Sequence, residues 1–116
     1  MATYTTQQAL DIWRVALVDG VRKDGPDLTA RQLAILLSVY LTPPPHTVRG
    51  LSADLAVAKP AVTRALDMLS NLDYVRRVPD PDDKRSIHIK RTVKGSVFLT
   101  EYGELVTASI NRHSEE

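Results

Sequence analysis

Apolar residues recur at helical spacing near the start of the chain and predict a helix over residues 6–21, with Thr5 or Thr6 as its N-cap. The stripe that we expect to face the core consists of Leu10, Trp13, Ala16, Leu17 and Val21. Three further apolar residues lie off this stripe: Ile12, Val15 and Val18. A helix that is apolar on more than one side requires a second contact surface.

A capping box predicts where the second helix begins. Thr29 is followed three residues later by Gln32, which indicates a helix over residues 30–41. The residues of this helix that we expect in the core are Leu33, Leu36, Leu37, Tyr40 and Leu41. The prolines at positions 43–45 then forbid helix and predict a stiff, extended connection.

Two short helical segments follow, residues 48–55 and 59–72, and the three residues between them predict a helix-turn-helix. The apolar stripe of the second segment, expected in the core, consists of Val62, Ala65, Leu66, Leu69 and Leu72. Its opposite face carries Pro60, Arg64, Asp67 and Asn71, flanked by Lys59 and Thr63. Because proline is tolerated only in the first helical turn, Pro60 places the start of this helix near Lys59.

A β-hairpin and a last helix complete the pattern. Residues 74–78 and 86–90 are predicted as strands, and residues 79–84 hold prolines and aspartates that suit a turn. Thr92 is a good N-cap for a final helix, whose apolar side is formed by Phe98, Tyr102, Leu105 and Ser109, with Val106 and Ile110 beside them. The order of elements predicts a mainly α fold with a small β-hairpin, a winged helix-turn-helix.

Length and composition bound the organisation of the chain. Its 116 residues, 43% hydrophobic and 25% charged, predict one globular domain, 1–116. Within it we expect an N-terminal helix in residues 1–24, a helix-turn-helix core with its wing in residues 28–95, and a C-terminal helix in residues 96–116. The chain has no cysteine, its first residues lack a signal-peptide pattern, and its longest apolar run is too short to span a bilayer. We therefore expect a cytoplasmic protein with no membrane segment.

The positive charge of the chain is concentrated in one third of its length. The net charge is only +1, yet residues 59–94 hold nine basic and five acidic residues, a net charge of +4. Such a distribution favours the binding of a polyanion by that third.

The hairpin motif resembles the MarR family of bacterial transcriptional regulators. The resemblance lies in the run Asp-Pro-Asp-Asp-Lys-Arg at residues 80–85, followed by Thr-Val-Lys-Gly at residues 92–95. Asp83, Arg85, Thr92 and Gly95 occupy the spacing of the family's wing signature, and the likeness extends over about residues 28–95.

This resemblance implies a regulator that binds double-stranded promoter DNA as a homodimer. The helix over residues 59–72 would enter the major groove, where Lys59, Pro60, Thr63 and Arg64 form the candidate DNA-binding face. The wing, residues 79–85, would reach the minor groove through Lys84 and Arg85, with Asp83 holding the arginine in place.

The resemblance also implies features outside the DNA-binding face. Short N- and C-terminal helices would form the homodimer, trimmed relative to the longer C-terminal extensions usual in the family. Many relatives respond to small aromatic effectors, but no ligand pocket can be recognised in this sequence. An effector is therefore left unassigned. Three positions depart from the family pattern: Ala58 replaces a polar cap, Asp73 a glycine and Arg91 a leucine.

Other functions find less support in the sequence. The aspartates of the wing fail the calcium-loop pattern at Lys84 and Arg85, and His46, His88 and His113 lack ligand spacing, so no metal is expected. With no phosphate-cradling glycine loop and no paired nucleophile and base, we expect neither an enzyme nor a cofactor. The rival hypothesis is a winged-helix protein-interaction module without specific DNA binding. About half of the remaining hairpin cations, Arg76, Arg77, Lys90 and Arg91, should simply face solvent.

Overall fold

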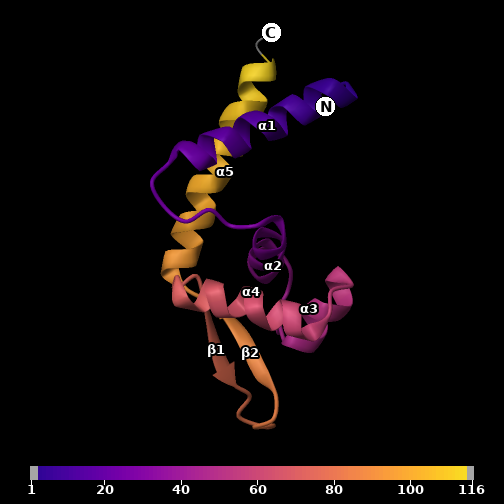
Figure 1. Ribbon diagram of the computed structural model, residues 1–116, viewed down its shortest axis with the longest axis vertical. Coiled ribbons are helices and arrows are strands. Elements are labelled where there is room, and N and C mark those ends of the chain that lie inside the picture. The colour runs from indigo at the N-terminus through magenta and orange to yellow at the C-terminus, as the bar shows by residue number, and fades with distance from the viewer. Residues whose placement is uncertain (1–2, 115–116) are drawn as a thin grey trace. The chain divides into compact units, whose positions relative to one another are not determined.

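The computed structural model describes residues 3–114, which form five helices and one antiparallel hairpin (Figure 1). In chain order these are α1 (Thr6–Arg22), α2 (Ala30–Leu41), α3 (Val48–Leu55), α4 (Lys59–Asn71), β1 (Val75–Pro79), β2 (Ile87–Arg91) and α5 (Val93–Ser114). The predicted winged helix-turn-helix architecture is confirmed, and α2 and α3 begin and end where the sequence indicates.

Both strands begin and end one residue later than predicted, because Tyr74 still belongs to the end of α4. Its backbone N–H donates to Leu69 O at 2.9 Å, and the N–H of Asp73 donates to Ser70 O at 2.9 Å. These two bonds, with Asp73 in the left-handed region at φ 61°, form a Schellman ending. The aspartate that replaces the family glycine therefore adopts the glycine-like conformation.

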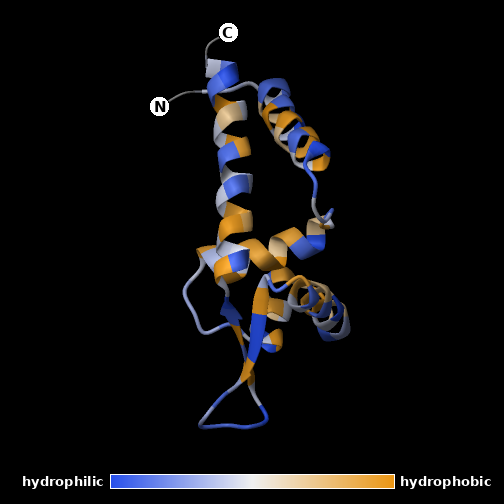
Figure 2. Cartoon of the chain, turned by 90° about the vertical axis from the view of Figure 1, so that its left-hand side faces the viewer, coloured by the Kyte–Doolittle hydropathy of each residue, from blue (hydrophilic) through white to orange (hydrophobic). Residues whose placement is uncertain are grey.

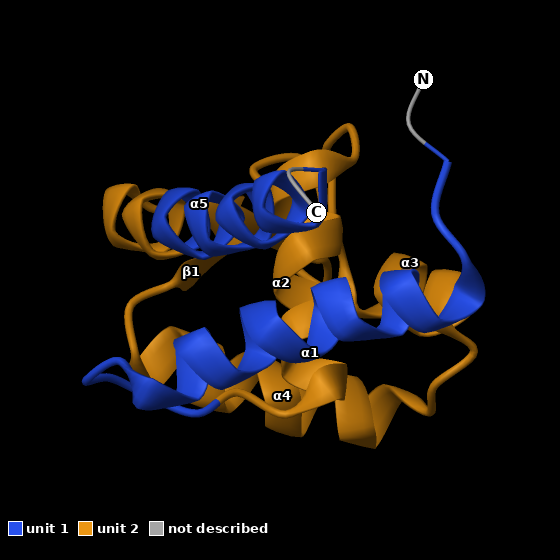
Figure 3. Cartoon of the chain, turned by 90° about the horizontal axis from the view of Figure 1, so that it is seen from above, with its two compact units in different colours: residues 1–27, 99–116 blue, residues 28–98 orange. Residues whose placement is uncertain are grey.

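The chain divides into two compact units (Figure 3). One comprises residues 1–27 and 99–116, and the other comprises residues 28–98. Helix α5 begins in the second unit and ends in the first.

The second unit holds most of the buried apolar side chains. Its core consists of Ile35, Leu36, Val39, Leu51, Val62, Ala65, Leu66, Leu69, Tyr74, Val75 and Ile89. The predicted core stripe of α4 is confirmed apart from Leu72, which is half-buried. The prediction for α2 is wrong in part: Leu37 and Leu41 are exposed, and Ile35 and Val39 are buried in their place. Since apolar residues occupy nearly every side of α2, periodicity could not select the buried one.

In the first unit, helix α1 packs on α5 through small residues. Ala16 is buried, Ser109 Oγ donates to Ile12 O at 2.7 Å, and a Cβ on Gly20 would lie 3.3 Å from the Tyr102 ring. The expectation that Trp13 lies in the core is wrong, because its side chain is 63% exposed. The stripe that contacts α5 passes through Ile12, Ala16 and Gly20, where the missing side-chain bulk lets the two helices approach.

The predicted stripe of α1 is therefore largely uncovered. Leu10 and Val21 are exposed like Trp13, while Leu17 is half-buried. On α5, Ser109 is buried as predicted, and Ile110 is exposed. The apolar face that stays exposed is therefore the stripe predicted to lie in the core, whereas the off-stripe residues Ile12, Val15 and Val18 are half-buried.

Candidate nucleic-acid interface

The helix-turn-helix is held by backbone and hydroxyl contacts around a tight turn. Ala56 ends α3 in the left-handed region at φ 53°, and Ser52 Oγ donates to Val57 O at 2.5 Å. Helix α4 then begins at Lys59 with Pro60 in its first turn, as predicted. Ala58, the N-cap residue, supplies no side-chain hydrogen bond.

Helix α4 separates an apolar face from a cationic one. The four buried residues of α4 are Val62, Ala65, Leu66 and Leu69. The four candidate DNA-binding residues, Lys59, Pro60, Thr63 and Arg64, are all exposed on the first turns of the same helix. Among the described residues, none of these four side chains forms an ion pair or a hydrogen bond, so the cations are available to a ligand.

The wing is an antiparallel hairpin closed by aspartate side chains. Val75 pairs with Arg91 and Pro79 with Ile87, and the N–H of Asp80 donates to Ser86 O at 2.9 Å. Within the loop, Asp83 Oδ1 accepts the N–H of Arg85 at 3.1 Å. The tip of the hairpin is hydrophilic (Figure 2).

Arg85 projects from this tip into solvent. Its side chain is 95% exposed, and its Nε lies 3.6 Å from Asp83 Oδ1. Lys84 and Asp83 are exposed beside it. Such an exposed pair adds little stability by itself. Asp83 therefore accepts the backbone N–H of Arg85 and lies close to its guanidinium.

The structure sorts the four remaining hairpin cations into two pairs. Arg77 bridges β1 to α4, with its guanidinium 2.6 Å from Asp67 Oδ1. Arg91 donates from Nε to Val39 O at 2.9 Å and from its terminal nitrogen to Thr42 O at 3.1 Å. The replacement of the family leucine by Arg91 thus neutralises the carbonyl end of α2.

Arg76 and Lys90 are the other pair, and they lie directly opposite each other across the hairpin. Both are exposed. Arg77 and Arg91 are exposed as well, so more of these cations reach solvent than the predicted half, although those two also contact other elements.

The threonine and glycine of the signature lock the wing onto the helices. The Tyr40 hydroxyl donates toward Tyr74 O at 2.7 Å and accepts the N–H of Thr92 at 2.8 Å. Thr92 Oγ1 donates to Asp73 O at 2.7 Å and caps α5 by accepting the N–H of Gly95 at 2.9 Å. A Cβ on Gly95 would overlap the Tyr40 hydroxyl and Tyr74 O, so this position requires glycine.

Sequence reasoning considered the histidines only as metal ligands and missed the contacts that they make within the fold. His88 Nε2 lies 3.2 Å from Asp80 Oδ2 within the hairpin. His46 is buried, and its carbonyl accepts the N–H of Ile89 at 2.8 Å. The strand register could have indicated the first contact, but no local signal indicates the second.

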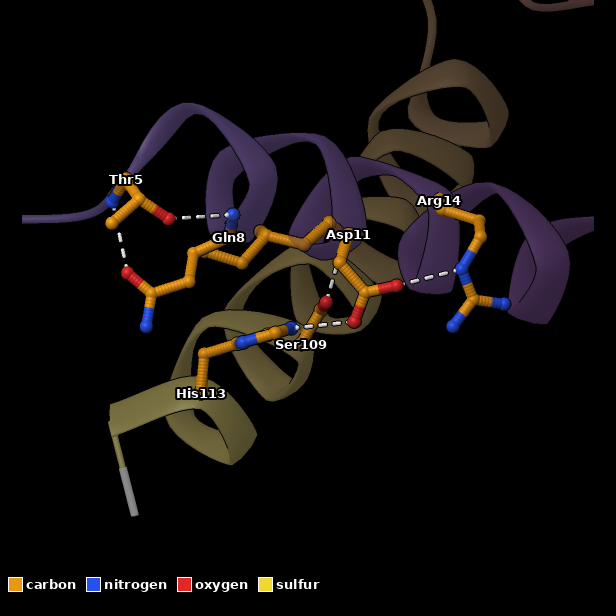
Figure 4. A network of polar contacts seen from close by, with 7 residues as sticks. Thr5, Gln8, Asp11, Arg14, Ser109 and His113 are labelled. Carbon is orange, nitrogen blue, oxygen red and sulfur yellow. Dashed lines mark hydrogen bonds and ion pairs between the residues drawn. The ribbon is translucent and has the colours of Figure 1, made fainter. Parts of the chain in front are cut away.

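A polar network lies in the unit that contains α1 (Figure 4). Asp11 accepts from Arg14 Nε at 2.7 Å, and its other oxygen lies 3.0 Å from His113 Nε2. The hydrogen bond from Arg14, with a further contribution from His113, lowers the pKa of Asp11. Thr5 and Gln8 form a reciprocal capping box beside this network.

An open depression of about 570 Å³ borders the network and is lined mainly by polar side chains. Within residues 3–114, no group of three or more acidic or histidine side chains is placed to hold a metal ion. Nor is any helix of this described part long and apolar enough to cross a membrane.

Comparison with known proteins agrees with this geometry. A sequence model of the MarR family matches residues 27–86. The multiple antibiotic resistance protein MarR of Escherichia coli (strain K12) is 33% identical over 89 residues, which are 74% of this chain and 59% of that protein. The chain therefore spans less than two thirds of the length of this relative.

Two solved structures are similar over most of the chain. The transcriptional regulator Tm0710 from Thermotoga maritima has a TM-score of 0.72 at 27% identity, covering 94% of this chain and 71% of that one. A mutant MarR from E. coli, complexed with operator DNA, has a TM-score of 0.69 at 27% identity, covering 92% of this chain and 74% of that one.

The helix-turn-helix followed by a two-stranded wing defines the class: a winged helix-turn-helix protein with the fold of a transcriptional regulator. Within this class, the chain belongs to the MarR family.

Proposed function

We propose that this protein is a transcriptional regulator that binds promoter DNA as a homodimer. The observation that carries the proposal is the cationic face of α4, where Lys59 and Arg64 are exposed and without protein partners in the described chain. Unpaired cations on a short, well-anchored helix are suited to phosphates and base edges. The structural likeness to a MarR bound to operator DNA supports the same conclusion.

In this proposal, α4 enters the major groove. A helix of 13 residues is roughly 20 Å long and fits the groove with its first turns leading. Arg64 and Thr63 would contact base edges, while Lys59 and the backbone near Pro60 would lie against phosphates. The ion pair between Arg77 and Asp67 links this helix to strand β1 of the wing.

The wing would then reach the adjacent minor groove. Arg85 is 95% exposed in the wing loop, and a guanidinium suits the concentrated negative potential of a narrow minor groove. Lys84 would add a phosphate contact, and Asp83 would restrict the directions that Arg85 can take.

A second copy of the chain is the proposed occupant of the exposed apolar face of α1. Leu10, Trp13 and Val21 expose apolar surface that a monomer would leave in water. Two-fold pairing through the terminal helices would bury this face and present two recognition helices to successive major grooves.

Two other predictions need their own tests. A winged-helix protein-interaction module would use the same exposed surface to bind a protein. Such a module would show no sequence-dependent or salt-dependent binding to DNA. A small aromatic effector would raise the melting temperature of the protein in a thermal-shift screen. A screen without hits would leave the DNA-binding proposal intact.

Three arginine variants test the proposed interface. With a DNA site selected by the wild-type protein, Arg64→Ala should weaken specific binding by roughly 1–3 kcal/mol and relax discrimination at one or two bases. Arg85→Ala should weaken binding across most sequences and reduce the salt slope. Arg22→Ala removes the same charge from an exposed position on α1 and should change neither property. Equal affinity of all three variants would refute the interface.

A further inference from the structure

The turn of the wing is held by hydrogen bonds and one ion pair of a single residue, Asp80. Asp80 Oδ1 accepts the N–H of Asp82 at 2.8 Å, and Asp80 Oδ2 lies 3.2 Å from His88 Nε2. Its own N–H donates to Ser86 O at 2.9 Å. Asp80 therefore joins the loop to both strands at the base of the segment that carries Lys84 and Arg85.

This contact is shielded from water more than the neighbouring pair at the tip. The side chains of His88 and Asp80 are 21% and 22% exposed, whereas Arg85 beside Asp83 is 95% exposed. Screening by solvent weakens an exposed pair, so the contact between Asp80 and His88 contributes more to the conformation of the wing than the visible pair at its tip.

The charges around His88 come from several elements. On its own face of the hairpin lie Arg76 and Lys90, which face each other across the strands. The helices and the loop that contact β2 carry Arg31 on α2, Arg49 and Asp54 on α3, and His46 in the loop. Among all described residues, Asp80 is the single ion-pair partner of His88.

We propose that Asp80 and His88 are positioning residues that hold the wing in the form that presents Lys84 and Arg85 to DNA, and that protonation of His88 strengthens this hold. The inference rests on the proposed DNA-binding function. Histidine changes charge between about pH 5 and pH 8, so DNA affinity should rise as the pH falls through this range.

Two alanine variants separate positioning from simple electrostatics. Asp80→Ala and Asp82→Ala each remove one negative charge from the same loop, but the carboxylate of Asp82 accepts no hydrogen bond from the described residues. Charge alone predicts that both variants bind DNA more tightly. Positioning predicts that Asp80→Ala binds about fivefold more weakly than Asp82→Ala at equal salt and pH. Circular dichroism of both variants should match that of the wild-type protein, which checks that they remain folded.

The dependence of DNA affinity on pH is a second measurement. A purely structural role of Asp80 and His88 would not change this dependence. Wild-type affinity should increase about threefold or more from pH 8 to pH 6, and His88→Gln, which keeps a hydrogen-bond donor, should lose this increase. Asp80→Ala keeps His88 and any direct effect of its charge on DNA but removes the contact between the two side chains. Positioning therefore predicts that the increase largely disappears in this variant, whereas a direct charge effect predicts that it stays. An Asp80→Ala profile equal to that of wild type would overturn the proposal.

A measurement without DNA covers the case in which a variant fails to fold. In the wild-type protein, the backbone amide signals of Asp82 and Arg85 should shift with the same midpoint as the His88 imidazole in an NMR titration. Amide signals that do not shift, or that shift with a different midpoint, would refute the coupling between His88 protonation and the conformation of the loop. If the wild-type protein binds no DNA, the proposed function fails together with this inference. If it binds, and Asp80→Ala matches Asp82→Ala, this inference alone fails.

Discussion

Among substitutions that add a single methyl group to α5, Gly95→Ala should destabilise the protein most. The new Cβ would overlap the hydroxyl of Tyr40 and the carbonyl oxygen of Tyr74. The hydroxyl cannot simply move aside, because it also accepts the N–H of Thr92 at 2.8 Å. The carbonyl belongs to the backbone at the start of the wing, so relief requires a shift of the hairpin itself.

The size of the effect follows from these contacts. Overpacking a well-packed site costs about 1–3 kcal/mol, and a part-buried donor left without its acceptor costs about 1–3 kcal/mol more. The gain in helix propensity from glycine to alanine offsets at most about 1 kcal/mol. We therefore expect Gly95→Ala to lower the free energy of unfolding by about 2–4 kcal/mol, a large share of the total for a small domain.

Urea denaturation followed by circular dichroism measures this change, and the same helix offers a matched control. Gly103 also lies in α5, and a Cβ there would meet no atom within 4 Å. Gly103→Ala should therefore stabilise the protein by about 0.5–1 kcal/mol, through helix propensity alone. If Gly95→Ala lies within about 0.5 kcal/mol of the wild-type value, the role assigned to this glycine is wrong.

Three further changes test separate parts of the account. Arg91→Met removes two hydrogen bonds to the carbonyl end of α2 and should cost about 1–2 kcal/mol in the same urea assay; an unchanged midpoint would contradict this. Because the pKa of Asp11 is lowered, its stabilising effect is complete above the ordinary carboxyl pKa and is lost as the pH falls through the lowered value. Arg14→Ala should raise the pKa of Asp11 in an NMR titration, and no upward movement would refute the assigned cause. Trp13→Glu should convert a dimer into a monomer by light scattering at micromolar concentration, whereas a monomeric wild-type protein would end the dimer proposal.

Local capping chemistry explains why the helices were predicted well. The reciprocal bonds of Thr29 and Gln32 start α2, and Pro60 allows only one register for the first turn of α4. Both signals act within four residues of the helix end and need no knowledge of tertiary structure. The strands were displaced by one residue because Tyr74 completes the ending of α4 before β1 begins.

Features that depend on distant partners could not be predicted in the same way. Nearly every side of α2 is apolar, so the choice of Ile35 and Val39 over Leu41 depends on where α4 lies. The sequence shows Arg91 only as a departure from the family leucine, because its hydrogen-bond partners lie 49 and 52 residues away in sequence. The exposure of Trp13 follows from close packing at Ala16 and Gly20, a preference that a hydrophobicity pattern cannot express.

The candidate DNA-binding face was predicted as a set of residues, and the structure places all of them in solvent. Their spacing on one helical face was readable from the sequence, because an α-helix returns to the same side every three to four residues. The contacts that hold the wing, from Asp80 to His88 and from Thr92 to Asp73, join different elements and required the structure.

Fluorescence anisotropy of the purified protein on random duplex DNA, from about 50 to 200 mM salt, tests the central claim most directly. A dimer presents Lys59, Arg64, Lys84 and Arg85 twice. If about half of these eight cations neutralise phosphates, the slope of log affinity against log salt is about −3.6, a loss of roughly 150-fold over this range. Binding that is absent at the lowest salt, or that does not change with salt, would contradict DNA binding and leave the protein-interaction module as the better account.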